Sequence, residues 1–410
     1  MVLRWFGVLD IVMHGVIHRN SEGLTVGIDA SNLRAGGGKI HLVELLRAAS
    51  PSLEGFDKVV VWAPQKTLSS IEDRPWLVKR SSPILEGHSL RRALWQRNCL
   101  GKWARTEGCN VLFVPGGSFA TDFRPVVTMS RNLLPFEWRE LQRYGVSLTS
   151  MRLLLLRWSQ SRSYRKADGV IFLTRYAEDA VLKVTGTLRG KRATIPHGVN
   201  ECFLRQPRRQ RSLEECDEQR PFRLVYVSII DNYKHQRQVA EAIATLRSEG
   251  LPITLDLIGP AYPPALRRLR RTLRRIDPTG SVVRYVGHVP HDELHGWYEK
   301  ADLCLFASSC ENMPNSLLEG MAFGLPIACS NRGPMPEMLG DASVYFNPED
   351  PMDIAKAIRQ WLDSPDSREQ NAQTAYNLAR HYSWRRCAEE TFRFLAHVRA
   401  EYTGSGRQST

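Results

Sequence analysis

Two glutamates separated by eight positions, Glu311 and Glu319, are the residues of this chain best placed to do chemistry. The segment between them has the composition of a helix start, with small polar residues and a proline near the first turn. An apolar helical face follows and is closed by Gly324 and Pro326. We therefore expect Glu311 in the loop before a helix and Glu319 about one turn inside that helix.

The backbone between the two carboxylates predicts an anion-binding site. The first N–H groups of a helix have no partner within the helix and attract negative charge. The residues that present these groups are Asn312, Met313, Pro314, Asn315 and Ser316. Two acidic hydrogen-bond acceptors that flank an anion site suit a ligand with hydroxyls at both ends and phosphate in the middle. A nucleotide diphosphate sugar is such a ligand.

A glycine-rich loop follows the first expected strand. Gly36, Gly37 and Gly38 open a helical pattern there, and three glycines let the backbone approach a ligand closely. The loop is neither a Walker loop nor a G-x-G-x-x-G motif, because Ile40 and His41 stand at the diagnostic positions. A plain strand–helix turn is the alternative, but such a turn needs only one glycine.

Lys234 lies just past the first expected strand of the second half of the chain. A cation at that point faces the crevice between two domains, where it could neutralise a departing diphosphate. From its position alone, Lys234 would be an ordinary surface lysine. Its location matches that of Glu311, and this match favours a functional role.

Two other types of chemistry are less well supported. The paired glutamates also admit a glycosidase, with one as acid and the other as nucleophile. One glutamate in a loop and one in a helix beside a phosphate site fits ligand holding better than nucleophilic attack. The sequence has no Asp-x-Asp triplet, H-E-x-x-H motif or C-x-x-C pair, so we expect neither a metal nor another cofactor.

The composition is that of a soluble globular protein with an anionic partner. The 410 residues are 42% hydrophobic and carry a formal net charge of +13. This charge suits a nucleotide phosphate, an acidic membrane surface or nucleic acid. We expect no nucleic acid, because the basic residues are scattered rather than interleaved with aromatic residues. The eight cysteines are interpreted as reduced residues of a cytoplasmic protein.

Short apolar runs alternate with helical patterns along most of the chain. The strands expected in the first half are 24–29, 59–62, 111–114, 126–129, 170–173 and 193–195. Those expected in the second half are 222–230, 253–258, 282–286, 303–306, 327–329 and 344–346. Continuous apolar strands separated by helices predict parallel sheets covered on both faces. The fold class is therefore α/β, with two doubly wound domains and ligand at the strands' carboxyl ends.

The expected domain organisation has six parts. They are an N-terminal extension (1–22), a first Rossmann-like domain (23–204), a linker (205–220), a second Rossmann-like domain (221–380), a last helix (381–403) and a disordered tail (404–410). The extension is apolar but interrupted by charges and too short to span a bilayer. We expect it to be poorly ordered or to form an interfacial helix.

Two helical segments carry much of the positive charge. Residues 266–276 combine a leucine stripe with six arginines, and this pattern favours a solvated helix face. Residues 139–166 mix arginines with leucine, methionine and tryptophan. That composition fits an ordinary packed helix or a basic surface helix that contacts anionic lipid, and the sequence leaves both open.

With these motifs placed, the chain resembles a family 4 glycosyltransferase of the GT-B fold from about Leu24 to Leu395. The resemblance rests first on the E-x7-E element within residues 306–326, followed by Pro336-Glu337. Three shorter motifs support it: Ile258-Gly259, Tyr285-Val286-Gly287-His288-Val289 and Ile195-Pro196-His197-Gly198-Val199. The Tyr233-Lys234-His235-Gln236 variant is similar to a subgroup of bacterial surface-polysaccharide and lipopolysaccharide assembly.

The resemblance implies retaining transfer of a hexose, such as mannose or glucose, from a nucleotide diphosphate sugar to a glycan or lipid-linked acceptor. The family is metal-independent, and its retention is pictured as front-face attack, in which the leaving phosphate oxygen accepts the acceptor's proton. The last helix of the fold crosses back to pack on the first domain. A cytoplasmic location follows, with peripheral contact at the inner face of an anionic membrane as a further possibility.

The resemblance also implies roles for individual residues. Glu311 would contact the donor sugar, Glu319 the ribose hydroxyls and Lys234 the diphosphate. Backbone N–H groups of 313–316 would hold sugar and phosphate. The backbone around His288 and Val289 would meet the base, and the Gly36–Gly38 loop would close over the phosphates.

Two positions depart from the family pattern. Ile229 stands where the family commonly has an arginine, so the phosphate charge must be met by Arg131 or Lys39. Ser130 stands where many members have a histidine, so the sugar contact falls to Asn132 or is lost. The alternatives to transfer are a nucleotide-sugar epimerase of the same fold and, less favoured, a basic nucleic-acid-binding protein.

Overall fold

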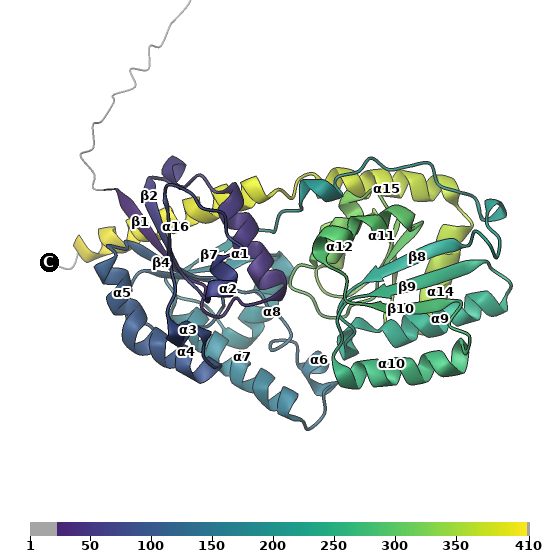
Figure 1. Ribbon diagram of the computed structural model, residues 1–410, viewed down its shortest axis with the longest axis horizontal. Coiled ribbons are helices and arrows are strands. Elements are labelled where there is room, and N and C mark those ends of the chain that lie inside the picture. Colours follow the sequence, from purple (N-terminus) through teal and green to yellow (C-terminus); the bar gives the residue numbers. More distant parts are fainter. Residues whose placement is uncertain (1–22, 408–410) are drawn as a thin grey trace, which may run out of the picture.

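The computed structural model describes residues 23–407, and the predicted extension at 1–22 lies outside the described residues. Two parallel sheets, each covered by helices on both faces, lie side by side in Figure 1. The α/β class and the two doubly wound halves predicted from the sequence are confirmed. No helix in the described part of the chain is long and apolar enough to cross a bilayer.

The first sheet has seven strands in the order β3-β2-β1-β4-β5-β6-β7. Their bounds are β1 Leu24–Asp29, β2 Phe56–Trp62, β3 Leu77–Arg80, β4 Val111–Val114, β5 Val126–Met129, β6 Gly169–Phe172 and β7 Lys191–Thr194. The edge strand β3, which pairs with β2, was not predicted. Its four residues are half-buried or exposed and end in Lys79 and Arg80, so it lacks the continuous apolar run of a central strand.

The second sheet has six strands in the order β10-β9-β8-β11-β12-β13. Their bounds are β8 Phe222–Val227, β9 Ile253–Ile258, β10 Val283–Gly287, β11 Leu303–Phe306, β12 Ile327–Ser330 and β13 Val344–Phe346. Every residue of the central strands β11 and β12 is buried. This burial on both faces explains why these strands read as unbroken apolar runs.

The helices of the first half connect its strands and cover its faces. They are α1 Gly36–Ala48, α2 Gln65–Leu68, α3 Pro83–Glu86, α4 Ser89–Trp95, α5 Gly101–Thr106, α6 Trp138–Gln142, α7 Leu148–Lys166 and α8 Arg175–Thr185. Those of the second half are α9 Gln236–Ser248, α10 Pro263–Ile276, α11 His295–Lys300, α12 Asn315–Ala322, α13 Met335–Leu339, α14 Pro351–Leu362 and α15 Pro365–Ala379. Between the halves, residues 205–220 contain one short 3-10 turn, Leu213–Glu215, and no strand.

The last helix, α16 (Trp384–Arg407), returns to the first half of the chain, as the resemblance implied. In Figure 1 it runs along the first sheet, and it packs against α1, β4 and the 3-10 turn Pro51–Glu54. The buried stripe predicted for it, which includes Trp384, Cys387 and Leu395, is confirmed. The helix continues to Arg407, past the boundary at residue 403 predicted for it, and residues 408–410 of the predicted tail lie outside the described residues.

The loops that follow the carboxyl ends of the strands meet between the two sheets. β1 leads into the glycine loop and β5 into Ser130. In the second sheet, β8 leads toward Lys234 and β11 toward Glu311. Strand order reverses around β1 and around β8, and open parallel sheets bind ligands at such switch points. The fold thus brings together four segments that lie far apart in the sequence.

Candidate active site

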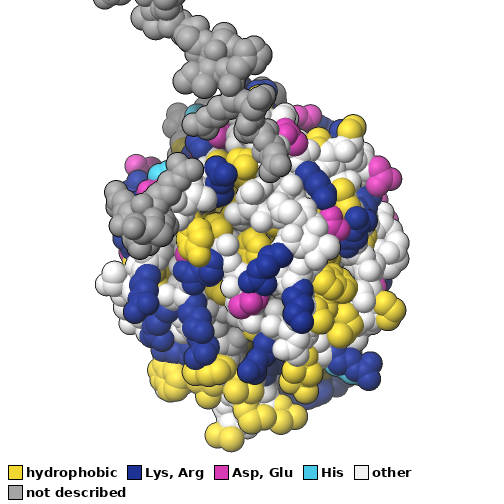
Figure 2. Space-filling view, turned by 90° about the vertical axis from the view of Figure 1, so that its left-hand side faces the viewer, with side chains coloured by type: hydrophobic (Ala, Val, Ile, Leu, Met, Phe, Trp, Pro, Cys, Tyr) yellow, Lys and Arg dark blue, Asp and Glu magenta, His cyan; other side chains and the backbone are white. Residues whose placement is uncertain are grey.

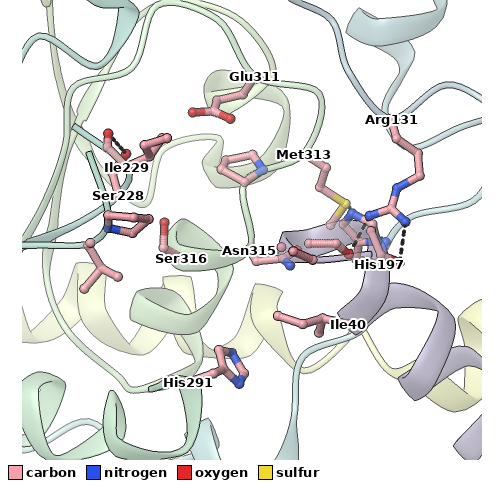
Figure 3. A pocket seen from close by; sticks show the side chains of 18 of the residues that line it. Ile40, Arg131, His197, Ser228, Ile229, His291, Glu311, Met313, Asn315 and Ser316 are labelled. Atoms are coloured by element: carbon pink, nitrogen blue, oxygen red, sulfur yellow. Dashed lines mark hydrogen bonds between the residues drawn. The ribbon is translucent and has the colours of Figure 1, made fainter. Parts of the chain in front are cut away.

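A cavity of about 770 Å³ opens between the two domains and is lined by residues from both (Figure 3). It contains most of the residues singled out in the sequence. These are Gly36, Gly37, Gly38, Arg131, Asn132, Lys234, His288, Val289, Glu311, Met313, Pro314, Asn315, Ser316 and Glu319. A volume of this size is typical of a site for a ligand as large as a nucleotide sugar.

Asn312 is one of the predicted residues that lie outside this lining. Its side chain is buried and donates from Nδ2 to Ser130 Oγ at 3.4 Å, while its carbonyl accepts from Thr174 Oγ1 at 2.9 Å. Both partners belong to the first domain, so Asn312 joins the two domains and does not line the cavity. The prediction that it contacts a ligand is not supported by this placement.

Glu311 and Lys234 form an ion pair at one end of the cavity. Lys234 lies in the 3-10 turn Asn232–Lys234 after β8, and Glu311 lies in the loop after β11, as predicted. Their side chains are 8% and 13% exposed, and the lysine ammonium also lies over the rings of Tyr233 and Phe306 at 5.2 and 5.3 Å. A cation and an anion are therefore held together in a largely dry wall of the site.

Glu319 lies in α12, as predicted, toward the other end of the cavity. Its Oε1 is 2.8 Å from His291 Nε2, and its Oε2 accepts from the Tyr298 hydroxyl at 3.3 Å. Figure 3 shows Glu311 and His291 at opposite sides of the view, with Asn315 and Ser316 between them. The arrangement of two carboxylates on either side of a helix start is thus present in the folded chain.

The hydrogen bond to Glu319 raises the pKa of His291, with burial acting in the opposite direction. Because the folded pKa is raised, the stabilisation by this pair is complete below the unfolded histidine pKa of about 6.5 and is lost as pH rises through the folded value. We expect the melting temperature of the wild-type protein to exceed that of His291→Gln by about 1–3 °C near pH 6, since the pair is partly exposed.

This difference should shrink toward zero as the pH rises above the raised pKa of His291. Differential scanning calorimetry of both proteins at matched pH measures it, and the comparison cancels titration elsewhere in the chain. A constant or growing gap between the two proteins as pH rises would contradict the pairing.

The start of α12 faces the cavity without a side-chain cap. Pro314 occupies the N-cap position, and no side chain accepts a hydrogen bond from the first turn of the helix. The Oδ1 atom of Asn315 is buried without a hydrogen-bond partner, although its residue lines the cavity. Polar groups left free at a helix start inside a cavity are available to a ligand. The opposite face of α12 is apolar and buried, as predicted.

The side chain of Arg131 binds the backbone of the glycine loop. Its two terminal nitrogens donate to the carbonyls of Gly37 at 2.6 Å and Gly38 at 3.0 Å (Figure 3). Burial lowers the pKa of Arg131 to about 10, which leaves it charged at neutral pH. Arg131 also lines the cavity, so the proposal that it meets the phosphate charge stays a prediction, with its terminal nitrogens here donating to the loop. Lys39 does not line the cavity, and its ammonium donates to the carbonyl of Lys66.

Two histidines at the cavity were given no role in the sequence, and the first is His197. Its Nδ1 is 2.9 Å from Nδ1 of His41, and its backbone N–H donates to the sulfur of Met313 at 3.2 Å. Burial and the nearby arginine lower the pKa of His197 to about 3, so it is neutral. The motif 195–199 was the available signal for His197. His291 lies in no motif, and only the fold brings it to Glu319.

Contacts between the domains surround the cavity. Glu337 accepts from the backbone N–H groups of Arg175 and Tyr176, both at 2.9 Å, at the start of α8. Elsewhere along the boundary, Glu349 pairs with Arg139 and Arg143. Two carboxylates of the second domain thus bind the first domain beside the cavity.

Two family models match the chain, one in each half. The model described as Glycosyltransferase Family 4 matches residues 35–201, and the model described as Glycosyl transferases group 1 matches residues 221–364. Both matches agree with the fold and with the motifs around Glu311. The chain belongs to this class of two-domain glycosyltransferases of the GT-B fold, and nothing in the comparisons favours an epimerase.

Two curated relatives match parts of the chain. The chain is 33% identical over 109 residues to O-antigen chain mannosyltransferase B of Escherichia coli, which is 27% of this chain and 29% of that protein. It is 27% identical to a glycogen synthase of Mycobacterium tuberculosis over 58% of this chain and 56% of that protein. The chain therefore spans at most about half the length of the curated relatives it matches first.

Solved structures share the whole fold. Sucrose-phosphate synthase from Thermosynechococcus elongatus superposes with a TM-score of 0.70 at 18% identity, covering 92% of this chain and 100% of that chain. Anabaena Alr3699/HepE in complex with UDP and glucose does so with a TM-score of 0.65 at 14% identity, covering 91% and 100%. At these identities the likeness establishes the GT-B fold of the chain.

Proposed function

We propose that this chain transfers a hexose, with retention of configuration, from a nucleotide diphosphate sugar to a glycan or lipid-linked acceptor. The observation that carries the proposal is the interdomain cavity, where an uncapped helix start lies between two carboxylates with a lysine at one end. A nucleotide diphosphate sugar matches this arrangement, because its hydroxyl groups can meet the two carboxylates and its diphosphate can meet the N–H groups between them. The Escherichia coli mannosyltransferase and the Anabaena structure with UDP and glucose support a hexose donor.

In the proposed reaction Glu311 binds hydroxyls of the donor sugar and Glu319 binds those of the ribose. The start of α12 donates N–H groups to the diphosphate, and Lys234 offsets the charge that develops as the nucleotide leaves. The leaving phosphate oxygen takes the proton of the acceptor hydroxyl, which attacks from the same face of the sugar. This scheme assigns no step to a metal. We place the enzyme in the cytoplasm, in surface-polysaccharide synthesis, with peripheral contact at the membrane.

A ligand screen by thermal shift tests the donor directly. A ligand that binds only the folded state stabilises it, by about 2.7 kcal/mol at one hundred times its Kd, and therefore raises the melting temperature. We expect one series among GDP- and UDP-hexoses to stabilise the protein, and incubation with that donor to release the nucleoside diphosphate. Isomerisation of the donor without release, or no stabilisation by any nucleotide sugar, would overturn the proposal.

Gly37 tests whether the glycine loop closes over the donor. A methyl group added there would lie 3.8 Å from the nearest nitrogens of Arg131 and Asn315, which is ordinary contact. Gly37→Ala should therefore fold normally, but its methyl group would occupy space needed by the phosphates. We expect about a tenfold higher KM for the donor, equivalent to about 1.4 kcal/mol of lost binding.

Gly36→Ala provides the contrast, because Gly36 has a φ of +65° while a methyl group there would meet no other atom. It should lower the melting temperature through backbone strain. Steady-state kinetics and thermal melts of the two variants check the pair. An unchanged donor KM in Gly37→Ala would show that the loop does not approach the phosphates.

A further inference from the structure

Helix α7 buries polar side chains and exposes apolar ones. Its buried residues are Ser150, Leu153, Gln160, Ser161, Ser163 and Tyr164, of which only Leu153 lacks a polar side-chain atom. Its exposed face carries Leu148, Met151, Leu154, Leu155 and Trp158. This is the reverse of a helix packed on a soluble core. The sequence left open whether this segment is a packed helix or a surface helix, and the structure shows a surface helix with its apolar side outward.

The exposed side chains form one continuous row. Leu148, Met151, Leu155 and Trp158 are 80%, 55%, 63% and 66% exposed, at a spacing of three or four residues that places them on one side of the helix. In Figure 1, α7 lies along the lower edge of the first domain. Figure 2, which views the molecule from the end formed by the first domain, shows hydrophobic side chains gathered at the lower edge, with Lys and Arg side chains above them.

The charge of α7 is entirely positive. Its 19 residues include four arginines and Lys166, and no aspartate or glutamate. Arg162 lies over the ring of Trp158 at 6.0 Å, and Arg157 over the ring of Trp138 at 5.9 Å. The cationic side chains thus border the apolar row, as in helices that lie in the plane of a membrane interface.

A groove of about 500 Å³ runs beside the row. Its walls combine Leu154, Trp158 and Val184 with the basic side chains of Arg157, Arg162, Arg165 and Lys166. Apolar walls with cations at the rim match an acyl chain and its phosphate head group. The groove and the row together provide an apolar surface bordered by cations, and a partner that is apolar inside and anionic at its surface would cover it.

Helix α10 shows that positive charge alone does not produce this arrangement. It carries six arginines, yet Leu269 is buried and Leu266, Leu273 and Ile276 are at least half-covered by the protein. The solvated basic face predicted for α10 therefore agrees with its structure. Among the helices of residues 23–407, α7 combines arginines with five exposed large apolar side chains, whereas the short helix α4 exposes two, Leu90 and Leu94, beside its arginines.

We infer that the outer face of α7 is a docking surface for an anionic phospholipid bilayer. Leucine, methionine and tryptophan side chains enter the interface between head groups and acyl chains, and the arginines pair with lipid phosphates. The inference deepens the proposed function, because it names the surface that would bring the cavity to a lipid-linked acceptor. The surface itself does not depend on which donor the cavity binds.

Sedimentation of the full chain with vesicles tests the inference. We expect binding to phosphatidylcholine vesicles that contain phosphatidylglycerol and little binding to phosphatidylcholine alone. Leu155→Glu/Trp158→Glu should weaken binding more than tenfold. Arg152→Gln/Arg162→Gln, at two exposed arginines of α7, should weaken it by about fivefold per arginine, and added salt should weaken the wild type in the same direction.

Leu53→Glu is the matched control, since Leu53 is 71% exposed on the same domain but lies in the turn that packs against β2 and α16. It should bind vesicles like the wild type. Equal binding by Leu155→Glu/Trp158→Glu, or no binding by the wild type, overturns the inference. So does a wild-type dimer that this variant converts to a monomer, because a second copy would then cover the face.

Melting temperatures of all variants guard against misfolding. Release of nucleoside diphosphate from a soluble donor, measured without vesicles, separates the two proposals. Vesicle binding without release would remove the proposed function and leave the docking surface in place. Release without vesicle binding would do the reverse.

Discussion

Lys234→Met is expected to lower the turnover of donor by about 10²–10³-fold, the effect of removing one charge-stabilising donor from an active site. The ammonium lies at the end of the cavity, paired with Glu311 and placed over two aromatic rings. Release of nucleoside diphosphate under saturating donor measures the loss. Lys300→Met, at an exposed lysine of α11, is the matched control and should leave turnover unchanged.

The substitution of Lys234 also affects stability. Breaking a buried pair by removing one partner costs about 3–5 kcal/mol, because the remaining charge is buried alone. Turnover must therefore be measured well below the melting temperature of the variant. Full turnover in folded Lys234→Met would exclude the lysine from the reaction.

Glu311→Gln is the second large effect. The amide keeps the shape of the side chain but removes its charge, and we expect turnover to fall by about 10²–10³-fold. Glu293→Gln, at an exposed glutamate near His291, should have no effect and serves as the control. Turnover by Glu311→Gln within a factor of two of the control would contradict its proposed contact with the donor sugar.

The double variant separates a structural pair from a functional one. Lys234→Met/Glu311→Gln leaves no unpaired charge in the wall of the cavity, so it should recover part of the stability lost in Lys234→Met. If the residues act on the donor, its turnover should stay as low as that of either single variant. Recovery of both stability and turnover would show that the pair only holds the fold together.

Much of the fold follows from patterns that local physics determines. The central strands are buried on both faces, and their unbroken apolar runs were therefore visible in the sequence. Strand β3 was missed because an edge strand of four residues with two charges needs no such run. The convergence of Gly37, Lys234 and Glu311 also followed, since the carboxyl ends of parallel strands share one edge.

The details of the site depend on side-chain directions that no sequence pattern fixes. Arg131 was expected to face a phosphate, but the nearest acceptors are the loop carbonyls of Gly37 and Gly38. Asn312 turns toward the first domain because Thr174 and Ser130 offer it partners there. The outward row on α7 was equally hidden, because leucines at helical spacing fit a buried face as well as an exposed one.

The course of α16 has a consequence for the order of events during synthesis. Ribosomes make the first seven strands early, yet the helix that covers α1 and β4 follows only after the entire second domain. In the nascent chain, the surface of the first domain that α16 will cover therefore stays exposed while about two hundred further residues are synthesised. The first domain can therefore complete its packing only after the second domain has been synthesised.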